Sequence, residues 1–80
     1  MKSTLKEKNN MIDKTATISN CTLGKDINIY KHSVLTNSNI SNNSVIGDFS
    51  KVENSKLGEF TQINRYNYVS KSVNIHLKNL

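Results

Sequence analysis

The most regular feature of the chain is the spacing of its branched aliphatic residues, which recur every five or six positions from Ile12 to Ile75. Up to Val69 the pattern returns every 17 residues and separates into three columns. The columns are Leu23, Ile40 and Leu57; Ile12, Ile29, Ile46 and Ile63; and Ile18, Leu35, Val52 and Val69. A fixed repeat of this length is typical of a solenoid, in which each repeat stacks on its neighbours.

The division of the period into thirds indicates the kind of solenoid. It matches neither the alternation of one long strand nor the turn of an α-helix. It fits a chain that winds around a triangle, with a short strand and a corner on each side and one aliphatic side chain per side pointing to the axis. Successive coils would stack at the strand spacing of about 4.8 Å, so that each column becomes a ladder.

We therefore predict an all-β parallel β-helix of three to four coils, each of roughly 17 residues. Residues 12–73 form the predicted coils, residues 1–11 a flexible N-terminal segment and residues 74–80 a divergent tail. The alternative is an irregular β domain.

Small and polar residues mark the predicted corners, where a hydroxyl can bond to backbone that a turn leaves unpaired. With Ile27 as the exception, these residues are Ser33, Ser44, Ser50, Thr61 and Asn67 on the longer sides, and Cys21, Ser38, Ser55 and Ser72 on the shorter ones. Asn20, Asn37 and Asn54 are placed to form a ladder of stacked amides. Gly24 and Gly58 suit a close backbone approach or an unusual φ.

Composition and charge narrow the function classes. The net charge of +5 is spread along the coils rather than clustered, which argues against a nucleic-acid partner. No apolar stretch follows the basic residues 1–11, so they do not resemble a secretory signal, and no run is long enough to span a membrane. The single cysteine, Cys21, fits a reducing compartment, and a cytoplasmic location without a membrane partner is expected.

Three units of the chain resemble the hexapeptide repeat, in which an aliphatic residue is followed by glycine, two variable positions and a small residue. They are LGKDIN (23–28), IGDFSK (46–51) and LGEFTQ (57–62). The longer stretches NCTLGKDINIYKH and NSVIGDFSKVENSKLGEFTQINRYNYV are similar to the opening coils of the xenobiotic, or antibiotic, acetyltransferase branch of the hexapeptide-repeat acyltransferases. That branch includes streptogramin acetyltransferases, some chloramphenicol acetyltransferases and many sugar O-acetyltransferases. The resemblance covers residues 16–73, less than half of a typical family member.

The resemblance implies a left-handed β-helix, a homotrimer with active sites between subunits, acetyl-CoA as co-substrate and a histidine as general base. The histidine loop of the family lies in later coils. Here the next expected coil is replaced by VNIHLKNL, with Asn74 where the register requires an aliphatic residue and Ile75 one position late. We interpret the chain as the product of a truncated or frame-shifted coding sequence. No catalytic, cofactor-binding or metal residue is therefore assigned, and this portion alone is expected to bind no acetyl-CoA and to be inactive.

The candidate catalytic residues have structural explanations that we prefer. His32 should face outward without a partner carboxylate, and His76 lies in the divergent tail. Cys21 shares an inward corner column with serines, so packing accounts for it. Asp48 and Glu59 follow glycines but belong to different sides of the triangle. Two histidines and one cysteine at distant spacings form no metal-ligand pattern.

A strip of aromatic and basic residues, Arg65, Tyr66 and Tyr68, is a candidate subunit interface, because tyrosine and arginine are enriched at interface anchors. The alternative is that its rings only cover an exposed side of the stack.

The sequence leaves two candidate functions. One is the N-terminal part of an O-acetyltransferase acting on a hydroxyl of a sugar or an antibiotic-like small molecule, and the other is a non-catalytic β-helix assembly or binding module.

Overall fold

The computed structural model describes residues 9–71 and 73–75, with side chains up to residue 71, and in this part the chain contains short strands and no helix. Each strand has two or three residues. In chain order they are β1 (Met11–Ile12), β2 (Thr17–Ser19), β3 (Thr22–Leu23), β4 (Asn28–Ile29), β5 (Val34–Thr36), β6 (Asn39–Ile40), β7 (Val45–Ile46), β8 (Lys51–Glu53), β9 (Lys56–Leu57), β10 (Gln62–Ile63), β11 (Tyr68–Ser70) and β12 (Val73–Ile75).

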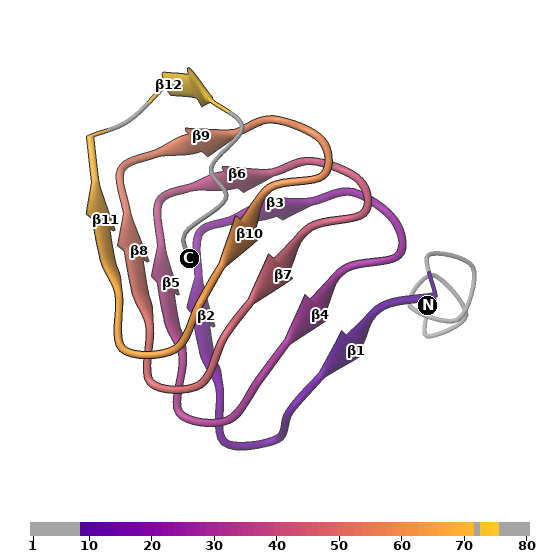
Figure 1. The fold of residues 1–80 in the computed structure, drawn as a ribbon, viewed down its shortest axis with the longest axis vertical. Coiled ribbons are helices and arrows are strands. Elements are labelled where there is room, and N and C mark those ends of the chain that lie inside the picture. The colour runs from indigo at the N-terminus through magenta and orange to yellow at the C-terminus, as the bar shows by residue number, and fades with distance from the viewer. Residues whose placement is uncertain (1–8, 72, 76–80) are drawn as a thin grey trace.

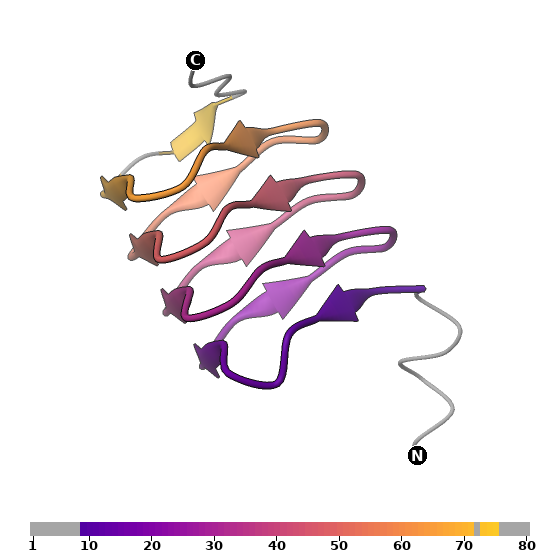
Figure 2. The ribbon, with the colours of Figure 1, turned by 60° about the horizontal axis from the view of Figure 1, so that its bottom comes forward.

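Every third strand belongs to the same sheet, which produces three parallel four-stranded sheets. Sheet A consists of β1, β4, β7 and β10, sheet B of β2, β5, β8 and β11, and sheet C of β3, β6, β9 and β12. Three successive strands make one coil, drawn as a loop in Figure 1, and the four coils stack in Figure 2. The two views together show a left-handed winding, so the predicted left-handed parallel β-helix is confirmed.

The register of the sheets equals the sequence period. Ile12 pairs with Ile29 and Ile29 with Ile46, and the same shift of 17 residues joins the strands of sheet B. Sheet C departs from it at β12, where Val73 pairs with Lys56 but Ile75 pairs with Leu57 across a register irregularity. The residue that seemed one position late is therefore brought back opposite its column, and the pairing extends past residue 73.

The core is a column of aliphatic side chains along the axis of the stack. In the second, third and fourth coils the predicted inward residues are at most 7% exposed, and they are Ile29, Leu35, Ile40, Ile46, Val52, Leu57, Ile63 and Val69. Ile12, Ile18 and Leu23 of the first coil are partly buried and pack against this core from the side of the second coil. Ile27, the exception among the polar corner residues, is fully buried and joins this core.

The buried corner hydroxyls bond to backbone carbonyls, as predicted. Ser33 Oγ donates to the carbonyl of Gly47 at 2.8 Å and Ser50 Oγ to that of Asn64 at 2.8 Å, in each case reaching the next coil. Ser38 Oγ donates to Thr36 within its own corner, also at 2.8 Å. A hydroxyl at these positions thus satisfies turn carbonyls that would otherwise be buried without a donor.

The predicted amide ladder is present between its first two members. Asn20 Nδ2 donates to Asn37 Oδ1 at 2.6 Å, and Asn20, Asn37 and Asn54 all have positive φ. The glycines were predicted to allow either a close approach of the chain or an unusual φ, and the structure confirms the first for Gly24. A Cβ on Gly24 would collide with the side chain of Asn42, whereas no glycine of the described chain has positive φ.

Candidate functional site

The outer face of sheet A carries two hollows, which makes it the candidate site. Side chains alternate between the two faces of a strand, so the neighbours of the buried isoleucines point outward here. Met11, Asn28, Val45 and Gln62 form one outward column through direct strand pairing. Tyr30 and Gly47, which follow β4 and β7, lie beside that column, and the tyrosine ring is 47% exposed.

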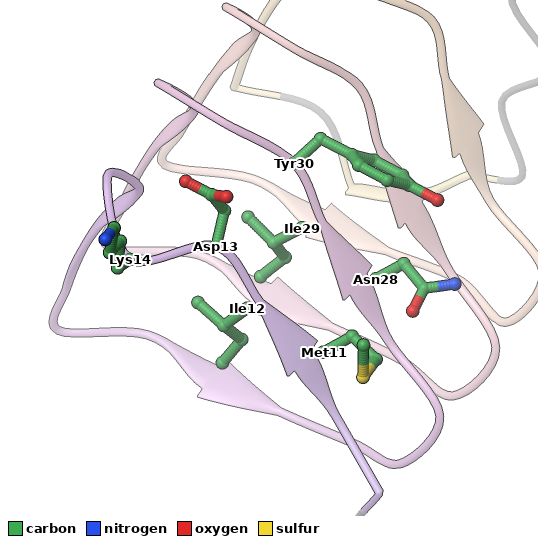
Figure 3. Close-up of a pocket in the computed structure, with 7 residues that line it drawn as sticks. All are labelled: Met11, Ile12, Asp13, Lys14, Asn28, Ile29 and Tyr30. Carbon is green, nitrogen blue, oxygen red and sulfur yellow. The ribbon is translucent and has the colours of Figure 1, made fainter.

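Two hollows lie on this face, one on each side of Tyr30. The lower hollow, of about 440 Å³, lies over β1 and β4 and is drawn in Figure 3. Its outer residues Met11, Asn28 and Tyr30 project to the same side of the sheet, away from the inward Ile12 and Ile29. The upper hollow, of about 300 Å³, lies over β7 and β10. Both are open at the surface, and Tyr30 belongs to the walls of both.

Gly47 lines the upper hollow at a position where no larger residue fits. A Cβ at this position would lie 2.6 Å from the backbone nitrogen of Arg65 and 2.8 Å from the carbonyl carbon of Asn64. The Gly47 amide also donates to the carbonyl of Ile63, in the same coil as Asn64 and Arg65, at 2.8 Å. Close stacking of the two coils thus requires glycine at this position, which lines the upper hollow together with Tyr30.

Charged groups border each hollow in pairs of opposite sign. Asp13 and Lys14 line the lower hollow, and Asp48 and Arg65 line the upper one. The pKa of Asp13 is lowered, first by the hydrogen bond from the Thr15 hydroxyl and then by that from the Thr15 backbone amide. The carboxylate is therefore charged at neutral pH, and the formal charges of each pair cancel.

A column of rings occupies the corner between sheets A and B. His32, Phe49 and Tyr66 are spaced by 17 residues and stack in order, with ring centroids 4.9 Å and 5.4 Å apart. We refer to these three residues as the ring column. Each has positive φ, which directs the side chain outward at the corner.

The structure divides the predicted strip of Arg65, Tyr66 and Tyr68. Tyr66 belongs to the ring column, whereas Tyr68 lies on sheet B and donates its hydroxyl to Glu53 Oε2 at 2.6 Å. Arg65 borders the upper hollow of sheet A. The three side chains are thus distributed over a corner and the two faces beside it.

His32 and Cys21 lie where the 17-residue register predicts. His32 is exposed, its ring stacks on Phe49, and its backbone amide donates to Thr15 Oγ1 at 2.9 Å. Cys21 packs against the core, and its thiol donates to the Ser19 carbonyl at 3.3 Å. These contacts fit structural roles.

Asp48 and Glu59 are not brought together, since the first follows β7 in sheet A and the second follows β9 in sheet C. His76 lies outside the described residues. Within residues 9–71 and 73–75, no three histidine, cysteine, aspartate or glutamate side chains gather where a metal ion could bind. No helix in the same ranges is long and apolar enough to cross a membrane.

Sequence reasoning missed the ring column and the hollows. The column carried a signal, because positions 32, 49 and 66 share the 17-residue spacing and hold only aromatic rings or imidazole. The hollows carried a weaker signal, which is that the large Tyr30 is followed by Gly47 at the same position of the next coil.

Comparison with known proteins adds no identification, since no family model matches the chain and no curated protein matches it significantly.

Proposed function

We propose that the chain is the N-terminal β-helix portion of an acetyl-CoA-dependent O-acetyltransferase of the hexapeptide-repeat class, acting on a hydroxyl of a sugar or an antibiotic-like small molecule. The observation that supports it is the left-handed winding of a coil built on units such as IGDFSK and LGEFTQ. Parallel crossovers are right-handed in about 98% of cases, so a left-handed stack is a restrictive feature. Fold alone does not determine chemistry, and the repeat units supply the link to this class.

The transfer needs a general base that takes the proton of the acceptor hydroxyl while the oxygen attacks the thioester carbonyl. CoA then leaves as the thiol and the acetyl group remains on the acceptor oxygen. We assign no such base within residues 9–71, because the imidazole of His32 stacks on Phe49 and the thiol of Cys21 packs against the core. The role of these coils is to provide a rigid frame against which catalytic groups outside them are positioned.

The proposed assembly is a homotrimer in which the ring column contacts a neighbouring subunit. All five aromatic residues of the chain are exposed, at 46–70%, while the core contains only aliphatic and small residues. Large exposed rings are typical anchors of protein interfaces. In the Phe49 and Tyr66 pair, the rings already stack at 5.4 Å and are thus ordered before association.

The proposed function is tested by grafting residues 12–71 in place of the first coils of a working hexapeptide-repeat acetyltransferase. We expect the graft to fold and to release CoA from acetyl-CoA in the presence of its acceptor, while the 80-residue chain alone releases none. A graft carrying Gly47→Val is the matched control and should lose activity, because its side chain would collide with the backbone of the next coil. A graft that assembles correctly but transfers no acetyl group contradicts the proposal.

A non-catalytic assembly or binding module is the second candidate. It is favoured by the placement of all five aromatic residues on the surface. If this candidate is correct, the full gene product binds a partner protein but releases no CoA from acetyl-CoA with any acceptor.

A further inference from the structure

We propose that the outer face of sheet A is a binding surface for a neutral carbohydrate chain, with Tyr30 as the ring on which a sugar stacks. This inference goes beyond acetyl transfer, because the surface is complete within this chain and binding needs no co-substrate. Its first support is shape. Two hollows of about 440 and 300 Å³ lie in line along the stack, separated by the half-exposed ring of Tyr30. Volumes of this size are at the lower end of those of small-ligand sites.

The second support is the mixture of hydrogen-bonding groups around the ring. A sugar hydroxyl both donates and accepts, so its partners should include donors and acceptors at short spacing. Asn28 and Gln62 offer amides that do both, Asp48 offers only acceptors and Arg65 only donors. Tyr30 adds an apolar ring face with a hydroxyl at its edge.

The third support is charge. The whole chain carries a formal net charge of +5, yet each hollow is lined by one carboxylate and one cation. A surface for phosphate or nucleic acid would concentrate positive charge, which this face does not do. A neutral polyhydroxylated ligand therefore fits it better than an anion.

The form of the site indicates an extended ligand rather than a single small molecule. Both hollows are shallow and open, and they adjoin at Tyr30 instead of forming one closed cavity. Gly47 lines the upper hollow without a side chain, so nothing projects from this position beside the tyrosine. A chain of several sugar units could occupy both hollows while one unit lies against the ring.

The test is calorimetric titration of the protein with four neutral hexasaccharides, namely cellohexaose, maltohexaose, mannohexaose and chitohexaose. We expect at least one to bind with a dissociation constant of about 1 mM or tighter, and Tyr30→Ala to weaken that binding by roughly tenfold. Gln62→Ala should weaken it by a smaller factor. The matched control is Tyr68→Ala, which removes a similarly exposed tyrosine from sheet B and should leave the affinity unchanged.

Circular dichroism of each variant checks that the β-helix is retained, and a dodecamer of thymidylate serves as the anionic probe. Binding of the dodecamer at least as tight as that of the best hexasaccharide would overturn the proposal. So would the absence of hexasaccharide binding to the folded wild-type protein, or equal binding by wild type and Tyr30→Ala. Each result is independent of CoA release, so failure here leaves the acetyltransferase proposal standing, and the converse also holds.

Discussion

At the scale of single residues, the corners of the stack impose an unusual backbone. Eleven non-glycine residues of the described chain have φ between 49° and 64°. In this conformation a corner amide can point back to the preceding coil, as when Phe49 donates to the carbonyl of Lys31 at 3.0 Å and Phe60 to that of Asn42 at 3.0 Å. Asparagine and aspartate tolerate this region, whereas bulky residues adopt it at a cost.

Phe60 permits a direct test of that cost. Its φ is 61° and its side chain is 61% exposed, so little packing depends on it. We expect Phe60→Gly to be more stable than Phe60→Ala by about 1 kcal/mol, because only glycine adopts this φ without strain. Urea unfolding followed by circular dichroism measures the difference.

The control pair is Gln62→Gly and Gln62→Ala, at an outward position inside strand β10. There the order should reverse, since glycine in a strand interior is the less stable choice. Equal stabilities of the two Phe60 variants would show that the corner is not strained.

The sequence predicted only part of this residue-scale picture. The asparagine column was visible because one residue type repeats at Asn20, Asn37 and Asn54. The positive φ of Phe49 and Phe60 could not be predicted, because an aromatic residue does not favour this conformation. At those corners the contacts between coils impose the conformation over local preference.

At the scale of strands and coils, stability depends on how closely one coil approaches the next. Each strand has only two or three residues, so it contributes few ladder hydrogen bonds by itself. The ladder of aliphatic side chains and the corner hydroxyls add contacts between the same coils. Neighbour contacts of this kind make the stability of a solenoid a sum over its interfaces.

A side chain at Gly47 would meet the backbone of the next coil, so its replacement should weaken the interface between the two coils. We expect Gly47→Ala to lower the free energy of unfolding by about 2–3 kcal/mol, because its Cβ would overlap backbone atoms that cannot rotate away. Thermal and urea unfolding measure the loss.

Gly24→Ala is the matched substitution one and a third coils earlier in the chain. The nearest obstacle there is the side chain of Asn42, which can move, and the cost should be nearer to about 1 kcal/mol. If both alanine variants lost the same stability, the backbone contact would not be the cause.

The first coil differs from the later ones at its ring corner, where a side chain accepts a hydrogen bond from an amide of the next coil. Asn10 Oδ1 accepts from the Ile27 amide and Thr15 Oγ1 accepts from the His32 amide, both at 2.9 Å. In later coils a backbone carbonyl fills the corresponding place at the ring corner, as Asp48 does for Tyr66. At the ring corner of the first coil a side chain thus takes the place of a main-chain carbonyl, a feature that the 17-residue period does not reveal.

At the scale of the whole molecule, the architecture followed from the sequence because every coil repeats the same inward residues. The sheets, their register and the core were predicted from the aliphatic columns alone, and the left-handed winding came from the resemblance of the repeat units. The outer face of sheet A lacks this regularity, since Met11, Asn28, Val45 and Gln62 differ from coil to coil. The hollows arise from neighbours as unlike as Tyr30 and Gly47, so their position became visible only in three dimensions.

The proposed trimer belongs to this scale and is tested through the ring column. We expect the wild-type chain to show a mass about three times its 9.0 kDa by light scattering, and Phe49→Asn with Tyr66→Asn to shift it to the monomer. Asparagine suits the positive φ of both corners, so the double variant removes the rings without adding backbone strain. Phe60→Asn changes an exposed ring at another corner and should preserve the trimer. An interface at the ring column would be contradicted if Phe60→Asn also became a monomer. It would likewise be contradicted if the double variant remained a trimer.

The register irregularity at β12 has a consequence for how such proteins diversify. Ile75 lies opposite Leu57 although the strand contains one more residue than its partner between the two paired positions. One additional residue inside a strand can therefore be absorbed locally while the coils beneath keep their partners. Over evolutionary time, descendants of one ancestor could gain or lose single residues within their strands, and alignments that assume constant spacing would underestimate their kinship.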